Sequence, residues 1–174
     1  MKFDKSNCQK LVIVGVLLMI MLALAALSAE FLTVANITNV LRQSAATIIA
    51  GCAVTMLMVS GNFDLSIGSI MAIAGTMSAI FVTWGIPNLA AILLSVLIGT
   101  LVGLINGFLV ILLNVPSIIA TLGTMYAVRG VAWVITGGNS VSRGLGKGFT
   151  ALGRSYMGPL PLSILLTAAI FALF

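Results

Sequence analysis

The sequence predicts an all-α polytopic membrane protein with about six transmembrane helices. Hydrophobic residues make up 61% of the chain and charged residues only 6%, whereas soluble domains carry about 25% charged residues. The mean hydropathy is +1.27. Between Arg42 and Arg129, Asp64 is the only charged side chain. Such a chain cannot cover a water-facing surface, so we expect a lipid bilayer around it.

Composition also argues against several functional classes. The net charge of +5 comes from basic residues that flank apolar runs or share one loop, without the stacking aromatics of a nucleic-acid surface. The chain has no histidine, and its two cysteines lie far apart, so neither a zinc site nor a disulfide framework is expected. No paired carboxylates and no nucleophile beside a base are found. We therefore expect no catalytic residues, no metal and no cofactor.

Six apolar runs account for the predicted helices, because a spanning helix needs about 20 apolar residues. The runs cover residues 11–29, 44–59, 65–84, 89–113, 115–136 and 160–174. The first has a basic flank (Lys2, Lys5 and Lys10) but exceeds a signal-peptide core, so we expect it to stay uncleaved. The last run is still apolar at Phe174, so we expect one transmembrane domain over 1–174 that is incomplete at its C-terminus.

The connections differ in character. Residues 30–43 are polar, but Ile37, Val40 and Leu41 share one helical face, which predicts a short separate helix in the membrane interface. Residues 137–159 read as a Gly-rich loop. Within that loop Gly144–Phe149 misses the spacing of a phosphate-binding loop, and no strand precedes it.

The octet Gly61–Gly68 holds the isolated carboxylate of Asp64. A carboxylate in apolar sequence is costly unless it is paired, hydrogen-bonded or wetted. The octet therefore predicts a helix break around Gly61–Asp64, with Asp64 and Ser66 as capping residues of the next helix. Two readings stay open: capping alone, or capping together with a role in lining a substrate pathway.

The fourth run carries Gly99, Gly103 and Gly107 at a spacing of four, which predicts a stripe where a neighbouring helix approaches closely. Asn106 lies beside this stripe, and we expect it to bond a partner on another helix. This role is more one of stabilising helix packing than of binding a ligand. Arg129 is the second charge within the apolar runs. It either snorkels toward an interface or pairs with Asp64.

These motifs together resemble the membrane-spanning permeases of bacterial ABC importers for simple sugars (the ribose, xylose, galactose and autoinducer-2 group). The resemblance covers about residues 31–138 in the order of that family. It is carried by Phe31-Leu32-Thr33, Asn36-Ile37, Leu41-Arg42-Gln43, Gly61, Asp64–Ser69, Gly103, Asn106-Gly107, Val115-Pro116, Ile119–Met125, Arg129-Gly130 and Thr136–Gly138. Asn62 and Phe63 depart from the usual Gly and Ile of that family.

The resemblance implies the N-terminal half of a permease. Such a permease pairs with a second permease copy or a homologous permease subunit, receives sugar from an extracytoplasmic binding protein, and is driven by a separate cytoplasmic ATP-binding subunit. It would lie in the bacterial inner (cytoplasmic) membrane. Asn62, Asp64, Ser66, Asn106 and Arg129 are then candidates for the substrate pathway.

The basic N-terminal tail predicts a cytoplasmic N-terminus, although this places the basic loop Arg143, Lys147 and Arg154 outside, against the positive-inside tendency. An external basic loop suits a docking surface for an acidic binding protein. Two other readings remain: a truncated membrane fragment that transports nothing, and a small self-contained carrier or channel.

Overall fold

The computed structural model describes residues 5–142, 144–157 and 160–173. The chain divides into two compact units, Met1–Ser44 and Ala45–Phe174. Within the described residues all regular structure is helical except one pair of two-residue strands, which confirms the predicted all-α class. The elements are α1 (Lys5–Leu27), α2 (Val34–Val59), α3 (Ile67–Thr83), α4 (Asn88–Gly107), the π-helix η1 (Phe108–Leu112), α5 (Ser117–Thr136), α6 (Lys147–Arg154), β1 (Tyr156–Met157), β2 (Leu160–Pro161) and α7 (Leu162–Leu173).

In the first unit, α1 exposes its apolar side chains along its length, from Leu11 to Leu27, as expected of a helix that faces lipid. Thr33 then starts α2 as a capping residue, because its Oγ1 accepts the N–H of Asn36 at 3.3 Å. The Asn36 amide donates in turn to the carbonyl of Phe31 at 2.8 Å. The first bond satisfies one of the free N–H groups at the helix start, and the second satisfies a carbonyl of the preceding turn.

The predicted separate interfacial helix over residues 30–43 is wrong, because α2 runs unbroken from Val34 to Val59. No Gly or Pro lies between Thr33 and Gly51, and the polar residues Arg42 and Gln43 are good helix formers. The second span therefore starts well before Ser44. At 1.5 Å per residue its 26 residues cover about 39 Å, so α2 is not a short span.

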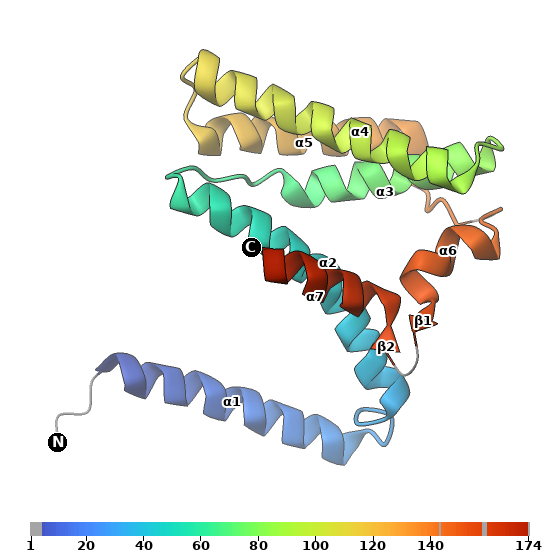
Figure 1. Ribbon diagram of the computed structural model, residues 1–174. Coiled ribbons are helices and arrows are strands. Elements are labelled where there is room, and N and C mark those ends of the chain that lie inside the picture. Colours follow the sequence, from blue (N-terminus) through green and yellow to red (C-terminus); the bar gives the residue numbers. More distant parts are fainter. Residues whose placement is uncertain (1–4, 143, 158–159, 174) are drawn as a thin grey trace. The chain divides into compact units, whose positions relative to one another are not determined.

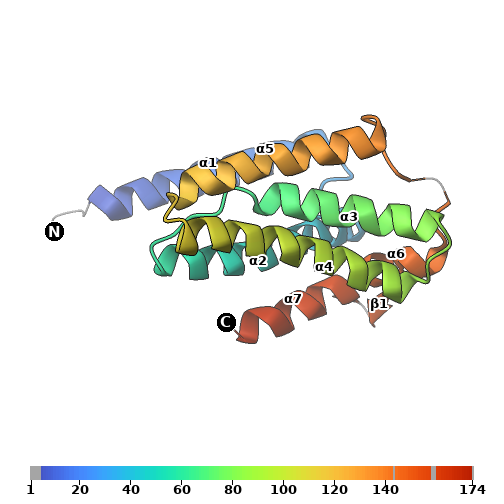
Figure 2. The same cartoon turned by 90° about the horizontal axis from the view of Figure 1, so that it is seen from above.

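In the second unit, α3 packs against both α4 and α5, and Figures 1 and 2 show the three helices side by side. Small and apolar side chains fill these contacts: Ile73, Ala79, Ala91, Ala120 and Val128 are buried. At Gly99, an added Cβ would meet Ile70 Cγ2 at 3.3 Å, whereas nothing within the described residues lies within 4 Å of such an atom at Gly103 or Gly107. Close packing is thus seen at Gly99, and for the other two glycines it stays a prediction.

The predicted span 89–113 agrees closely with α4 followed by η1. The π-helical turn ends with the N–H of Leu113 donating to the carbonyl of Phe108, and Asn114 takes a left-handed conformation at φ 53°. Pro116 then precedes α5 as its N-cap residue, with φ −52° and ψ 130°. Its fixed φ suits this position at the helix boundary.

The predicted loop 137–159 contains a short helix, α6, which the sequence did not indicate because Gly148 and Gly153 weaken a helix. Packing supports it: an added Cβ at Gly148 would lie 2.9 Å from Asn88 Nδ2, at the start of α4. After α6, β1 pairs antiparallel with β2. The predicted run 160–174 becomes helical only at Leu162, and Thr167 of α7 donates to the carbonyl of Ala45 at 3.4 Å.

Four helices in the described part of the chain are long and apolar enough to cross a membrane. They are Gln9–Leu27, Val34–Val59, Asn88–Leu112 and Ser117–Thr136, while α3 and α7 are shorter apolar helices. The chain is therefore a multi-pass membrane protein.

Candidate functional site

The break between α2 and α3 is the first functional feature that the fold builds. Gly61, at φ 80°, ends α2: its N–H donates to the carbonyl of Met58, and the N–H of Asn62 donates to that of Leu57, both at 3.0 Å. This pair of bonds is the Schellman arrangement that a left-handed glycine permits. The chain then runs without helical structure to Ser66.

Hydroxyl groups of α5 satisfy the backbone of this non-helical segment. The N–H of Phe63 donates to Ser117 Oγ, and the N–H of Leu65 donates to Thr121 Oγ1, each at 3.2 Å. Two extended residues rise about 6.6 Å, which matches the rise of about 6 Å over four helical residues. The segment therefore runs alongside α5, and alternate N–H groups find hydroxyls one turn apart.

Asp64, Ser66 and Asn106 form a hydrogen-bonded cluster at the start of α3. Asp64 Oδ1 accepts the backbone N–H of Ser66 at 2.7 Å and the Ser66 hydroxyl at 2.5 Å. Asn106 Nδ2 of α4 donates to Ser66 Oγ at 2.8 Å. Ser66 has no exposed surface and Asn106 is 5% exposed, whereas Asp64 is half-buried.

Counting the available protons shows which group donates and which accepts in each hydrogen bond of this cluster. An ionised carboxylate only accepts, and a serine hydroxyl has one proton. Because Ser66 gives that proton to Asp64, its oxygen accepts from the Asn106 amide, whose NH₂ must face it. Asn106 Oδ1 then points elsewhere and is buried without a hydrogen-bond partner among the described residues. The cluster offers a single buried acceptor beside a fixed carboxylate.

The predicted site residues meet only in part. Asp64 binds the N–H of Ser66 at the helix start, as the capping interpretation expects, but Ser66 makes no side-chain cap of its own. Asn106 has the expected interhelical partner. Asn62 stays outside the cluster, its amide 3.4 Å from the carbonyl of Ser60.

Arg129 lies apart from the cluster. It is eight residues beyond Thr121 on α5, which is about 12 Å along the helix axis. Its side chain is exposed, and it lines a groove of about 690 Å³ between α3 and α5. No ion pair joins Arg129 to Asp64 in the part of the chain that the structure describes.

Of the predicted docking loop, Arg143 lies outside the described residues. Lys147 and Arg154 form the two ends of α6, and their side chains also lie outside what the structure describes. Their role in docking a partner stays a prediction.

Sequence reasoning missed Ser117 and Thr121. A signal was present: two hydroxyl residues at a spacing of four, directly after Pro116, at the start of a mostly apolar helix. Such residues usually bond their own helix, as Thr121 also does with the carbonyl of Ser117 at 2.7 Å. Only their position beside the extended segment shows that they also accept hydrogen bonds from its backbone.

Comparisons with known proteins agree with this architecture. The family described as "Branched-chain amino acid transport system / permease component" matches residues 36–174. The chain is 33% identical over 159 residues to the ribose import permease protein RbsC of Haemophilus influenzae, covering 89% of this chain and 49% of that protein. It is 35% identical over 153 residues to the xylose transport system permease protein XylH of Escherichia coli K12, covering 87% of this chain and 39% of that protein.

RbsC of Escherichia coli K12 is 30% identical over 154 residues, with 86% of this chain and 48% of that protein covered. No solved structure matches the chain. The chain spans about half the length, or somewhat less, of the curated relatives it matches. The predicted resemblance to sugar permeases of ABC importers is confirmed, and the chain belongs to this family of transport-system permease components.

Proposed function

We propose that this chain supplies the transmembrane pathway of an ATP-driven importer for a simple sugar such as ribose or xylose. The observation that carries the proposal is the polar cluster of Asp64, Ser66 and Asn106 at a break between apolar helices. Irregular backbone at membrane depth is tolerated where it lies against protein or a water-filled path, and broken helices are where many transporters hold their substrates. The relationship to ribose and xylose permeases supports the choice of substrate.

The chemistry of the cluster favours a neutral polyhydroxylated substrate over an amino acid. An amino acid zwitterion needs a cation and a carboxylate of the protein close together to balance its two charges. Arg129, however, lies about 12 Å along α5 from Thr121, the residue that bonds the segment beside Asp64. A sugar instead needs donors and acceptors, which Asp64, Ser66 and Asn106 provide. Asn62 remains a candidate at the α2 end of the break.

The proposal includes six membrane crossings. The third is made by the non-helical segment together with α3, since the 17 helical residues of α3 cover about 26 Å and the extended segment adds the remaining length. α7 would make the sixth. With a cytoplasmic N-terminus, the Gly61 end of the second unit faces the cytoplasm and the loop after α5 faces outward.

The proposed partners are a second permease copy or a homologous permease subunit, a cytoplasmic ATP-binding subunit and an extracytoplasmic sugar-binding protein. The basic loop with Arg143, Lys147 and Arg154 would contact the binding protein. Charge reversal at Arg143 and Lys147 is then expected to raise the binding-protein concentration needed for half-maximal uptake. Unchanged uptake in both reversals would remove the loop from the docking surface.

The test of the substrate is uptake by the native transporter in a strain without other pentose importers. We expect labelled ribose or xylose to be taken up in an ATP-dependent manner and labelled leucine not. Uptake of leucine alone would overturn the sugar assignment.

The test of the site is Asp64→Asn, which keeps an oxygen that accepts from Ser66 but removes the charge. Reduced uptake at normal membrane abundance is expected. Uptake equal to wild type would show that the charge of Asp64 is dispensable.

A further inference from the structure

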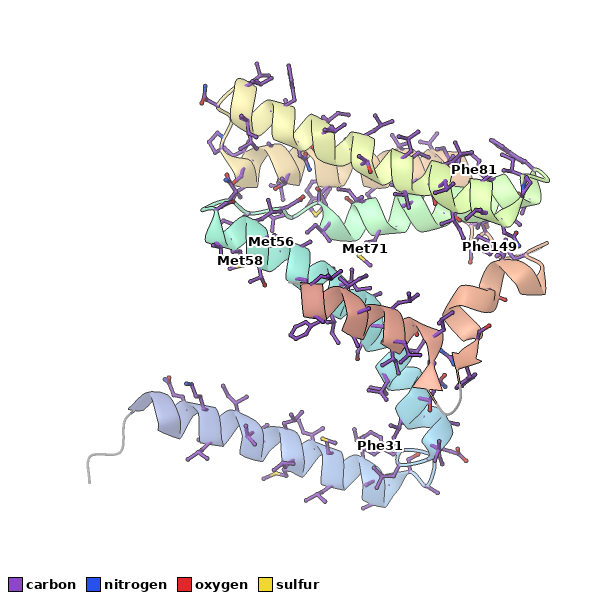
Figure 3. All side chains as sticks on the ribbon, in the orientation of Figure 1. Phe31, Met56, Met58, Met71, Phe81 and Phe149 are labelled. Atoms are coloured by element: carbon purple, nitrogen blue, oxygen red, sulfur yellow. The ribbon has the colours of Figure 1, made fainter. Side chains whose placement is uncertain are left out.

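The groove between α3 and α5, which we call the Arg129 groove, lies apart from the Asp64 cluster. Thr76 of α3 lines one wall, Arg129, Trp133 and Thr136 of α5 line the other, and Asn139 and Ser140 close one end. Met71, labelled in Figure 3, projects from α3 at its edge. The volume of the groove, about 690 Å³, falls in the range of about 300–1,000 Å³ typical of small-molecule sites.

Three polar side chains of the groove lack a hydrogen-bond partner within the described residues. Arg129 and Trp133 are one helical turn apart, so both project from one face of α5. No carboxylate lines the groove, and within the described residues the side chains of Arg129, Thr76 and Ser140 make no hydrogen bond. An exposed guanidinium on an otherwise apolar helix is costly in a membrane and marks a pathway or a ligand contact.

Trp133 is held in place by the loop that follows α5. Gly137 and Gly138 have φ values of 58° and 74°, and an added Cβ at Gly138 would lie 3.0 Å from Trp133 Nε1. The backbone therefore packs directly against the indole ring, and any side chain at residue 138 would displace it. Trp133 nevertheless remains 67% exposed, so much of the ring is free for a ligand.

We propose that the Arg129 groove is a binding site for a monosaccharide ring, separate from the Asp64 cluster. The indole offers an apolar face to the C–H groups of the sugar. The guanidinium fork can donate two parallel N–H bonds to neighbouring hydroxyls, and Thr76 adds a further polar partner. This proposal rests on the proposed function and adds a second contact point for the same substrate, at the opposite end of α5.

Ligand protection at Ser140 tests the groove without disturbing Arg129 or Trp133. Ser140→Cys is compared with the matched control Ser142→Cys, which lies two residues further and does not line the groove. Both are made with Cys8→Ser and Cys52→Ser in the native transporter. Saturating ribose or xylose is expected to slow maleimide labelling of Ser140→Cys roughly fivefold, as for a cleft that a ligand largely buries, and to leave Ser142→Cys unchanged.

Two outcomes separate this proposal from the proposed function. Normal sugar uptake without protection at Ser140→Cys overturns the groove alone. Absence of any sugar uptake, with no protection, overturns the proposed function and the groove together.

Substitution in the groove gives a second readout. Arg129→Gln and Trp133→Ala are each expected to raise the KM of uptake about tenfold, as the loss of one strong contact does, with little change in the maximal rate. Trp133→Phe should restore most of the affinity, and Trp84→Phe, at the end of α3 and outside the groove, should change nothing. A KM effect of Arg129→Gln confined to an anionic sugar acid would overturn the neutral-sugar assignment. If Trp133→Ala fails to reach the membrane, the protection experiment with Ser140→Cys decides whether the sugar binds in the Arg129 groove.

Discussion

At the scale of single residues, Ser66 holds the cluster together. Its hydroxyl donates to Asp64 and accepts from Asn106, and its carbonyl accepts the hydroxyl of Ser69 at 2.7 Å. Because Ser66 is fully buried, loss of its hydroxyl leaves the buried Asn106 amide without that partner and removes one hydrogen bond from the half-buried Asp64. A buried polar group left unsatisfied costs stability.

Ser66→Ala is therefore expected to lower the free energy of unfolding by about 2 kcal/mol, the cost of orphaned buried polar groups. The matched control is Ser60→Ala, because Ser60 is exposed and bonds only the carbonyl of Leu57 in its own helix. Denaturant unfolding in detergent micelles measures both. Equal effects of the two substitutions would contradict the cluster.

Thr121 has a comparable role toward the backbone. Thr121→Val removes the acceptor for the N–H of Leu65 and is expected to cost about 1–2 kcal/mol, while Thr121→Ser should retain most of the stability. Thr124→Val is the control on the same helix, since Thr124 bonds only the carbonyl of Ala120. Hydrogen exchange at Leu65 provides a direct measurement: it should accelerate in Thr121→Val and not in Thr124→Val.

At the scale of helices, α3 depends on its close contact with α4. A Cβ at Gly99 already meets Ile70 at 3.3 Å, so a larger side chain must push the two helices apart. Gly103 and Gly107 face a hollow lined by Leu101, Leu104 and other apolar residues of α4 and η1. The glycine stripe thus has two different surroundings within one helix.

Gly99→Leu is expected to lower the free energy of unfolding of the second unit by about 1–3 kcal/mol, as overpacking does. Gly103→Leu should leave it nearly unchanged. Thermal unfolding of both variants in micelles tests the difference. A destabilisation by Gly103→Leu in the assembled transporter, but not in the isolated chain, would show that the stripe packs against another subunit.

At the scale of the whole molecule, orientation in the membrane decides which end of the second unit meets the incoming sugar. The break between α2 and α3 and the turn that leads from α4 to α5 lie at one end of the layer formed by α3, α4 and α5, and the end of α5 lies at the other (Figure 1). With a cytoplasmic N-terminus, the Arg129 groove opens outward and the Asp64 cluster lies toward the cytoplasm.

Ser142→Cys and Ser60→Cys test this orientation with two isosteric changes at opposite ends. In intact cells, a membrane-impermeant maleimide is expected to label Ser142→Cys and to leave Ser60→Cys unlabelled until the membrane is opened. The reverse pattern would place the N-terminus outside and would reconcile the basic loop with the positive-inside tendency.

Residue patterns alone predict the helical class, the positions of most helices and the break at Gly61. These follow from local physics: long apolar runs must form helices in lipid, a left-handed glycine ends α2, and Pro116 marks the start of α5. They also identify Asp64 and Asn106 as residues that need polar partners, because lone polar groups in apolar runs are costly.

The packing of the helices, in contrast, selects the partners that these residues find. Asn106 bonds Ser66 across 40 positions of sequence, and Thr121 bonds Leu65 across 56. Local residue patterns do not show which residues of two helices so far apart in sequence lie opposite each other. The same packing leaves Arg129 apart from Asp64, in the groove between α3 and α5. Hydrogen bonds between helices depend on how the helices are set against each other, and that arrangement comes from the shapes of buried side chains rather than from any local motif.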